Sequence, residues 1–340
     1  MYFSTSATTL ALLTILPSSV LVHAVHAVNA TRSDKRGLIY ITTEDSATDD
    51  AAFTGSNTGL TWYYNYGAVP TSSLESTSLA FVPMLWGAPS SPTTDTSFLD
   101  SIKSQLSSGS SITHILTFNE PDGTTSTGGS SIDPSVAAQT WLTQITPLRS
   151  TYGLKVGLPA VTGSESGFTW LSNFNSSCHS LSSNSSSTTT TTTNCTADFI
   201  PIHWYGNFEG LASHIGQVQA TYPDLPIWIT EYGYPYQSLS TTQDFYNTSA
   251  EYFDRLDYVA RYSWFGAFRS DVSNVGPNAA FFTQKGKLTD IGSWYLGGAE
   301  TGNVPKGTAA PGKGVGGGMG WKWVLGIVGG VCLLLDEGWI

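Results

Sequence analysis

Short apolar runs, rich in β-branched and aromatic residues, recur along the middle of the chain. Runs of this kind that are apolar on both faces are typical of strands in a parallel sheet. The predicted strands are Gly37–Thr42, Thr61–Asn65, Leu79–Trp86, Thr113–Asn119, Lys155–Val161, Phe199–Trp204, Ile227–Thr230 and Tyr262–Phe268.

Stretches with helical patterning separate most of these strands. Pro134–Arg149 has Asp133 as its N-cap and Pro at the first helical position, and Glu209–Tyr222 and Thr241–Tyr258 are two more helices. Eight alternating strand and helix units in residues 37–297 predict a single α/β domain with the (β/α)8 TIM-barrel fold. An open doubly wound sheet is the alternative, but no Gly-rich phosphate-binding turn follows the first strand.

The N-terminal region has the pattern of a secretory signal peptide. Leu10–Val28 is apolar apart from a short break and leads into small residues that suit cleavage. Lys35-Arg36 is a dibasic pair directly before the first strand. Residues 1–36 are therefore predicted to be a signal peptide with a short pro-segment, and a buried N-terminal helix is the alternative.

The C-terminal region changes composition twice. Residues 298–320 are rich in Gly, which predicts a flexible linker, and residues 321–340 form an apolar tail. Its apolar core, Trp323–Leu335, is shorter than the ~20 residues of a membrane-spanning helix. A tail of this length suits a lipid-anchor signal, whereas the charged pair Asp336-Glu337 counts against one. Membrane or cell-wall anchoring and an uninformative tail both remain open.

The cysteines and glycosylation sequons agree with export. Cys178 and Cys195 bracket a run of Ser, Asn and Thr, and an oxidising compartment would join them as a disulfide. Sequons for N-glycosylation occur at Asn175, Asn184, Asn194 and Asn247. We therefore expect a secreted, extracellular glycoprotein.

Charged residues are scarce. They make up 11% of the 340 residues, against a usual share of about 25%. The 14 basic and 25 acidic residues give a net charge of −11, which excludes nucleic acid as a partner. Aromatic residues reach 12%. Such a surface suits a neutral, hydroxyl-rich ligand, although secreted proteins in general share this composition.

Two of the few carboxylates stand at predicted strand ends. Glu120 follows the fourth strand and Glu231 the seventh, so the two lie across the mouth of the predicted barrel. Glycosidic cleavage needs such a pair: one carboxyl protonates the leaving oxygen and the other attacks or stabilises the sugar carbon. Partial burial would raise the pKa of the acid and keep it protonated. The alternative is that each Glu only caps a turn.

Aromatic residues gather at the same strand ends. Sugar rings pack their C–H faces on aromatic rings, so about half of these residues are expected to face the cleft and the rest to lie in the core. His203 is the best-placed histidine for binding sugar hydroxyls, with a core position as its alternative. The aromatic candidates are Trp62, Tyr64, Trp86, Trp204, Tyr205, Tyr232 and Trp264.

Other chemistries lack their motifs. The histidines have no metal-ligand spacing, and neither CxxC nor HExxH occurs in the sequence. Gly163–Gly167 has Glu165 where a nucleophile elbow needs Ser. We expect no metal and no cofactor.

The strand-end motifs resemble a known group. Asn119-Glu120-Pro121 and Thr230-Glu231-Tyr232-Gly233 look like the acid/base and nucleophile strands of clan A glycoside hydrolases. Phe118–Asp122, Leu158–Ala160 and Ile200–Gly206 resemble glycoside hydrolase family 128, which includes fungal endo-β-1,3-glucanases and cell-wall proteins of the alkali-sensitive-linkage type.

The resemblance implies a retaining endo-β-1,3-glucanase of the fungal cell wall. Glu120 would act as general acid and then base, Glu231 as nucleophile, and Asn119 as a hydrogen-bond donor to the sugar 2-hydroxyl. The two carboxyl groups of a retaining enzyme lie about 5–5.5 Å apart. A monomer that binds β-glucan is expected. A non-catalytic glucan-binding protein on the same barrel, and a hydrolase of another β-glycan such as β-1,6-glucan or mannan, are the alternatives.

Overall fold

Eight short strands follow one another along the chain, each overlapping an apolar run that predicted it. They are seen in a computed structural model that describes residues 33–55, 58–183 and 195–307. Most strands are shorter than predicted, and β8 begins three residues earlier. The strands are β1 Gly37–Ile39, β2 Trp62–Tyr64, β3 Ala80–Phe81, β4 His114–Ile115, β5 Lys155–Val156, β6 Ile200–Tyr205, β7 Ile227–Gly233 and β8 Val259–Trp264.

All of the strand pairs are parallel. The strands form three sheets with the orders β1-β2-β3, β4-β5 and β6-β7-β8. Isolated parallel bridges link the sheets: Met84 pairs with Leu116, Gly157 with Phe199, and Arg36 with Tyr262. Each strand is thus paired in parallel, directly or through residues at its ends, with the next strand in the sequence.

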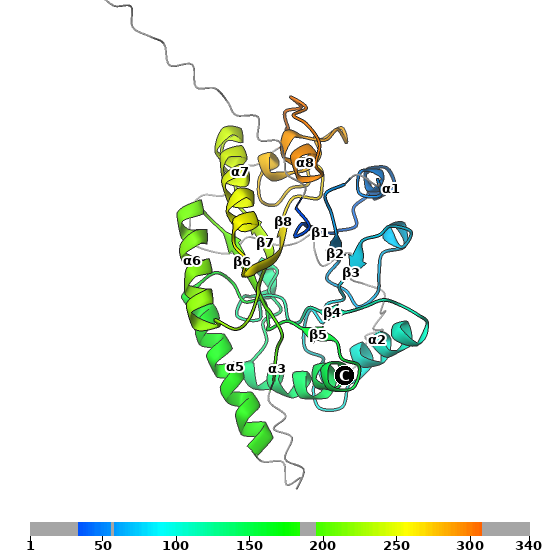
Figure 1. Ribbon diagram of the computed structural model, residues 1–340, viewed down its shortest axis with the longest axis vertical. Helices are drawn as coiled ribbons and strands as arrows, with labels where there is room; N and C mark the ends of the chain where they lie inside the picture. The colour runs from blue at the N-terminus through cyan, green and yellow to red at the C-terminus, as the bar shows by residue number, and fades with distance from the viewer. Residues whose placement is uncertain (1–32, 56–57, 184–194, 308–340) are drawn as a thin grey trace, which may run out of the picture.

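Helices surround these strands (Figure 1). The predicted helix Pro134–Arg149 is divided into α3 and α4 by a π-helical turn at Trp141–Ile145, and Asp133 caps it by accepting a hydrogen bond from the Ser135 amide. Strands buried between helices make this an α/β domain. The helices are α1 Ser46–Asp49, α2 Ser97–Ser107, α3 Pro134–Thr140, α4 Thr146–Ser150, α5 Glu165–Ser183, α6 Phe208–Thr221, α7 Leu239–Arg255 and α8 Asp290–Tyr295.

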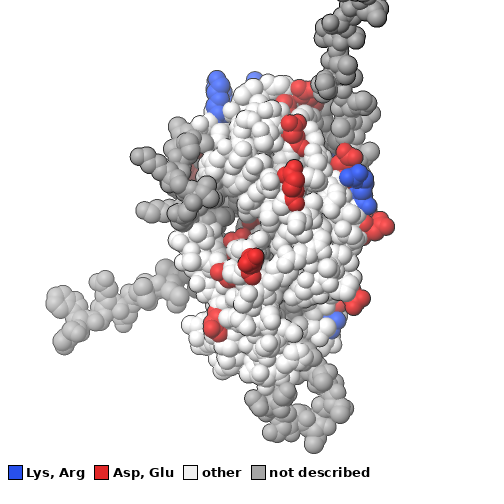
Figure 2. All heavy atoms as spheres, turned by 90° about the vertical axis from the view of Figure 1, so that its left-hand side faces the viewer, with Lys and Arg blue, Asp and Glu red and all other residues white. Residues whose placement is uncertain are grey.

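The low charge of the sequence is visible on the surface. Figure 2 shows the side that carries α5, α6 and α7, where uncharged atoms cover most of the face and acidic side chains are scattered among them. Basic side chains lie only toward the edges of this view. This face offers no basic stripe to a phosphate backbone, in agreement with the charge balance.

The dibasic pair before β1 is built into the fold. The Arg36 side chain is buried, and its guanidinium donates hydrogen bonds to the Tyr262 hydroxyl and to the carbonyl groups of Trp294 and Tyr295. Lys35 donates from Nζ to the Phe253 carbonyl at the C-terminal end of α7, where a helix favours positive charge. Arg36 is thus a buried part of the domain, and processing after this pair stays a prediction.

The domain also extends past residue 297. The amide groups of Thr301 and Gly302 both donate to Asp290 Oδ1, at the start of α8. Ser270 Oγ donates to the Lys306 carbonyl at 2.6 Å. Residues 298–307, predicted as the start of the linker, thus pack against the domain because their backbone groups are satisfied by it.

The remaining terminal predictions lie outside the described residues. These are the signal peptide, the rest of the linker and the apolar tail at residues 321–340. Within the described part of the chain, none of the helices has the length and apolar character needed to cross a membrane.

The predicted disulfide is confirmed. Cys178, on α5, is bonded to Cys195, 17 residues further along the chain. Of the sequons, Asn175 is exposed on α5 and Asn247 is half-buried on α7, whereas Asn184 and Asn194 lie outside the described residues. Glycosylation at these positions stays a prediction.

Replacing both Cys178 and Cys195 with Ser is expected to lower the free energy of unfolding by about 2–4 kcal/mol, because the bond restricts the unfolded chain. Thermal or urea denaturation of the double variant measures this loss. Reduction of the wild-type protein should reproduce the loss and have no effect on the variant. Equal stability of the two oxidised proteins would contradict the prediction.

Candidate active site

Glu231 lies in β7 and is held by two tyrosine hydroxyls. Its Oε1 accepts a hydrogen bond of 2.7 Å from Tyr66, and its Oε2 accepts one of 2.6 Å from Tyr205. Burial, reinforced by the Glu231 charge, raises the pKa of both phenols well above their usual range, so they stay protonated donors. The two bonds fix the orientation of the carboxylate.

Glu120 follows β4 in a strained backbone conformation. Its φ of 42° lies in the left-handed region, which is costly for a residue with a side chain. Hydrogen bonds hold it there, because its amide donates to the Ala160 carbonyl at 2.7 Å and its carbonyl accepts from the Gly123 amide at 2.8 Å. Strain that is held in place by surrounding bonds is a mark of functional positions.

His203 lies between the two carboxylates. Its Nδ1 is 2.9 Å from Glu120 Oε1 and 3.6 Å from Glu231 Oε2. A register shift after Ile202 pairs His203 with Glu231 on the neighbouring strand, which brings both side chains to the same place. The three side chains each offer an atom within 4.8 Å of the other two.

The pKa values of two members of this buried group are shifted by burial and by their neighbours. Burial raises the pKa of Glu120, and the nearby Glu231 charge adds to this effect, while the bond with His203 opposes it. Burial lowers the pKa of His203, but the attraction of Glu231 and Glu120 outweighs burial and raises it. The site therefore places a proton-retaining carboxyl beside a second carboxylate, which is the arrangement for general acid catalysis.

Within the described part of the chain, one group of side chains has donor atoms close enough to hold a metal ion, and it consists of Glu120, His203 and Glu231. Their donor atoms are already engaged with one another and with tyrosine hydroxyls, which suits proton chemistry between the carboxyl groups. The other buried polar atoms of the site include His203 Nε2 and Asn119 Oδ1, which have no hydrogen-bond partner among the described residues.

Asn119 directly precedes Glu120, and its predicted role as a donor to a sugar hydroxyl is not tested by its contacts within the protein. Its backbone amide donates to the Trp86 carbonyl at 2.9 Å, and its Nδ2 donates to the Gly128 carbonyl at 3.1 Å. The side chain is buried, and its oxygen is the atom left without a partner. Trp86 is half-buried next to it. Binding of sugar by Asn119 and Trp86 stays a prediction.

Four of the predicted sugar-binding aromatics lie away from the carboxylates. Tyr232 and Trp264 are fully buried and contact the Phe245 ring of α7. Trp204 stacks on His214 of α6. Successive residues of a strand point to opposite faces, so Tyr232 faces away from Glu231, and Trp204 away from His203 and Tyr205. About half of the aromatics were expected to lie away from the cleft, and these three do so because side chains alternate along a strand.

Trp62 is the fourth, and it lies at the opposite end of the strands. It is the first residue of β2, fully buried, and the Arg261 guanidinium lies 5.3 Å from its ring centre. Tyr64, on the same face, is also fully buried and donates to the Thr230 carbonyl. Of the seven, Tyr205 donates a hydrogen bond to Glu231, and Tyr64 also lies close enough to Glu231 for that carboxylate to help burial raise the pKa of its phenol. His203 contacts both carboxylates from a buried position.

Tyr66 was not among the site residues predicted from the sequence. It follows β2 with a φ of 59° and reaches Glu231 from across the fold. The predicted second strand ended at Asn65, and the motif Tyr64-Asn65-Tyr66-Gly67 was the signal available. A polar aromatic residue just beyond a strand end was grounds for including it.

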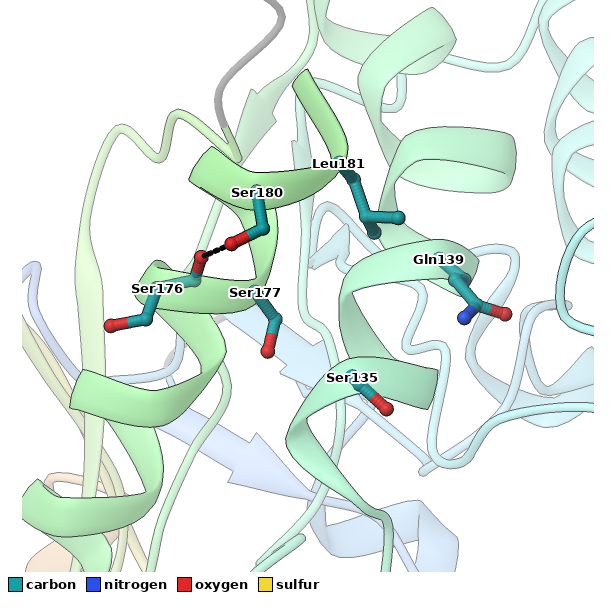
Figure 3. A pocket seen from close by; sticks show the side chains of 6 residues that line it. All are labelled: Ser135, Gln139, Ser176, Ser177, Ser180 and Leu181. Carbon is teal, nitrogen blue, oxygen red and sulfur yellow. Dashed lines mark hydrogen bonds between the residues drawn. The ribbon is translucent and has the colours of Figure 1, made fainter. Parts of the chain in front are cut away.

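A separate pocket lies between α3 and α5 and is lined by uncharged side chains (Figure 3). Its volume of about 250 Å³ lies below the ~300–1,000 Å³ of typical ligand pockets. All of its lining side chains are uncharged: Ser135, Gln139, Ser176, Ser177, Ser180 and Leu181. It therefore offers no acid or base, and the carboxylate pair remains the candidate active site.

Gly129 supports the conformation of Glu120. A Cβ at residue 129 would lie 2.6 Å from the Glu120 carbonyl oxygen and against the Gly123 backbone. Gly129→Ala is therefore expected to displace Glu120 and lower kcat by about 10- to 100-fold, since small misplacements of catalytic groups are costly. Steady-state kinetics of a glycan substrate measures the loss.

Gly216→Ala is the matched control, because a Cβ there would meet no atom within 4 Å. It should retain wild-type kcat. If Gly129→Ala also kept full activity while remaining folded, the close approach of Gly129 would have no part in holding Glu120.

Comparison with known proteins points to sugar chemistry. Residues 37–295 match the family described as "Glycosyl hydrolase catalytic core". The chain is 33% identical over 272 residues to Alkali-sensitive linkage protein 1 of Schizosaccharomyces pombe, an alignment that covers 78% of this chain and 44% of the relative. The chain thus spans less than half of that relative's length.

Solved structures have the same fold. The family 128 subgroup VI exo-β-1,3-glucanase of Aureobasidium namibiae is 20% identical, with a TM-score of 0.62 over 77% of this chain and 96% of that one. A subgroup I endo-β-1,3-glucanase variant of Amycolatopsis mediterranei, in complex with laminaripentaose, is 26% identical, with a TM-score of 0.57 over 78% and 99%. A subgroup VII oligosaccharide-binding protein of Trichoderma gamsii is 21% identical, with a TM-score of 0.57 over 79% and 94%.

Proposed function

Because the chain belongs to the glycosyl hydrolase catalytic core family, we propose that it is a retaining β-1,3-glucanase built on a (β/α)8 barrel. The resemblance to glycoside hydrolase family 128 read from the sequence motifs is confirmed. The observation that carries the proposal is the approach of Glu120 and Glu231 to within 4.8 Å through their nearest oxygens, with His203 between them.

The barrel is supported by the strand pairing. Parallel bridges connect β3 with β4 and β5 with β6, and the bridge from Arg36 to Tyr262 connects the last strand with the first. A closed ring of parallel strands places residues at their C-terminal ends around one mouth. Glu120 follows β4 and Glu231 lies near the end of β7, as an active site at that mouth requires.

The separation of the carboxyl groups favours retention of configuration. Inverting enzymes hold the two groups about 6.5–9.5 Å apart to admit a water, whereas retaining enzymes hold them about 5–5.5 Å apart. Glu231 is assigned as the nucleophile because both of its oxygens are held in place by the Tyr66 and Tyr205 hydroxyls. Glu120, with its raised pKa, is the proton donor.

The reaction then runs in two displacements. Glu231 attacks the anomeric carbon while Glu120 gives its proton to the departing glycosidic oxygen, so a glycosyl-enzyme ester forms and the first product leaves. Glu120, now ionised, takes a proton from a water that attacks the same carbon. The ester breaks, Glu231 is released as a carboxylate, and Glu120 regains its proton.

The substrate follows from the relatives. The structures of the Aureobasidium and Amycolatopsis proteins are those of β-1,3-glucanases, and the latter contains laminaripentaose. The Schizosaccharomyces relative is named for an alkali-sensitive linkage. We infer action on β-1,3-glucan of a fungal cell wall by an exported protein, and the Cys178–Cys195 disulfide supports export.

A panel of soluble β-1,3-glucan, β-1,6-glucan and mannan tests the substrate and linkage. Release of reducing ends from β-1,3-glucan above the other two is expected, and the product sizes distinguish endo from exo action. Proton NMR of the first products should show the β-anomer. An α-anomer would overturn retention, and preferred cleavage of another glycan would overturn the linkage.

A non-catalytic glucan-binding protein is the second candidate. The same fold is found in the Trichoderma oligosaccharide-binding protein. Here both carboxylates are present and close together, which favours hydrolysis. Binding to insoluble β-1,3-glucan without release of reducing ends would decide for the second candidate.

A further inference from the structure

A pocket lies at the N-terminal ends of the strands, away from the catalytic carboxylates. Among its lining residues, His114 and Lys155 are the first residues of β4 and β5, and Phe199 directly precedes β6. The pocket has a volume of about 300 Å³, at the lower end of the range of small-molecule sites. We propose that this basal pocket binds a small organic carboxylate, whose charged group pairs with the Arg261 guanidinium.

Arg261, in β8, is the charged group of the basal pocket that lacks a partner. Its Nη1 is buried without a hydrogen-bond partner, and within the described part of the chain no carboxylate forms an ion pair with the guanidinium. The side chain as a whole is half-buried and lines the pocket. Burial lowers the pKa of Arg261 to about 10, because the charge loses hydration. An anion in the basal pocket would supply the acceptor and the opposite charge that this group lacks within the protein.

Aromatic rings hold the Arg261 guanidinium in place. The register of β7 and β8 pairs Trp228 with Arg261, and the guanidinium carbon lies 4.1 Å from the centre of the Trp228 ring. Phe199 stacks on Trp228, with ring centres 4.0 Å apart, and both rings line the basal pocket. The face of an indole attracts the guanidinium charge but offers no lone pair to its N–H donors. The stacking therefore orients the guanidinium and leaves its donors for a ligand.

The other ionisable groups around the basal pocket leave an excess of positive charge. Asp198 forms ion pairs with Arg149 Nε at 2.9 Å and with Lys155 Nζ at 3.3 Å, so two cations share one carboxylate. Burial, followed by repulsion from Arg261, lowers the pKa of His114 to about 4, so this imidazole is neutral near pH 7. The net charge of the chain is −11, and this positive pocket is a local exception to it.

An organic carboxylate fits these features better than a phosphate or a neutral sugar. A guanidinium offers a carboxylate two parallel N–H donors, and a single negative charge balances the one unpaired cation. The rings of Phe199 and Trp228 suit an apolar body attached to the carboxylate, which inorganic phosphate does not have. A neutral sugar would leave the charge of Arg261 unbalanced. The inference is independent of the proposed function, because the basal pocket shares no residue with the carboxylate pair.

Isothermal titration calorimetry with benzoate, benzamide and inorganic phosphate tests the basal pocket. Benzoate carries a carboxylate on an aromatic body, and benzamide has nearly the same shape without the charge. Benzoate is expected to bind about 10-fold or more tightly than benzamide, the effect of a charge-assisted pair of hydrogen bonds, and more tightly than phosphate. Arg261→Met keeps much of the side-chain length and loses the donors, so it should weaken benzoate binding by about 10- to 100-fold.

Lys103→Met is the matched control, because it removes an exposed positive charge from α2, outside the basal pocket, and should bind benzoate as the wild type does. Should Arg261→Met fail to fold, Arg261→Lys replaces it: the charge stays, but an ammonium cannot form the planar fork, so benzoate binding should still weaken. The proposal is overturned if the wild type binds benzoate no better than benzamide, if phosphate binds more tightly than benzoate, or if the folded Arg261 variant binds benzoate as tightly as the wild type.

Discussion

Replacing Glu231 with Gln is expected to lower kcat on β-1,3-glucan by about 10³-fold or more, while the protein stays folded. An amide does not form the glycosyl ester, and loss of a nucleophile is among the costliest changes to an enzyme. Gln has nearly the same shape, and its carbonyl oxygen still accepts a bond from Tyr66 or Tyr205. Reducing-end release, with circular dichroism to confirm folding, measures the effect.

Tyr66→Phe and Tyr205→Phe are the matched variants. Each removes one hydroxyl from Glu231 and leaves the carboxylate itself in place, so each should lower kcat by about 10-fold, the effect of one charge-assisted hydrogen bond. An active Glu231→Gln protein would remove Glu231 from the role of nucleophile. Tyrosine variants that lose as much as Glu231→Gln would show that orientation, not attack, dominates.

Replacing Glu120 with Gln is expected to lower kcat by about 10²- to 10⁴-fold on glucan, because the leaving oxygen loses its proton donor. The loss should be much smaller in the step that cleaves an aryl glycoside whose phenol leaves without protonation. This contrast separates a general acid from a residue that only supports the fold. Equal losses on both substrates would contradict the acid role.

The pH dependence of activity should also differ between the wild type and Glu120→Gln. Burial raises the pKa of Glu120, and the protonated form is the one that acts, so wild-type activity should fall as the pH rises through this raised pKa. The alkaline limb should disappear from the pH profile of Glu120→Gln. A limb that persists in the variant would belong to another group, of which His203 is the nearest.

The strands and the meeting of Glu120 with Glu231 could be predicted because their evidence is local. Each apolar run is short and bounded, and Glu120 and Glu231 follow such runs directly. Where a strand ends relative to its apolar run depends on pairing with neighbours, so β4 and β5 are each shorter than their runs. The positions of the two glutamates did not depend on these boundaries.

The face that each side chain occupies was harder to predict. Tyr232 is next to Glu231 in the sequence, yet it packs against Phe253 of α7. Alternation along a strand would have excluded it once Glu231 was placed inside. The pairing of His203 with Glu231 depends on a register shift that passes over Thr230, and a bulge of this kind has no local sequence signature here.

Contacts from distant segments were beyond prediction for a similar reason. Tyr66 reaches Glu231 across 165 residues of sequence, and nothing near Tyr66 indicates its partner. The burial of Arg36 likewise depends on Tyr262 and on the carbonyl groups at the C-terminal end of α8. Such residues resemble surface positions until the chain has folded around them.

The burial of Arg36 bears on when a processing protease is able to act. The peptide after Arg36 leads straight into β1, and the carbonyl of Lys35 accepts a hydrogen bond from the Tyr262 amide. A dibasic-specific protease needs this segment extended in its own cleft, so cleavage would have to precede folding. Once the chain has folded, the bond is out of reach of such a protease and the Arg36 guanidinium stays with the folded domain.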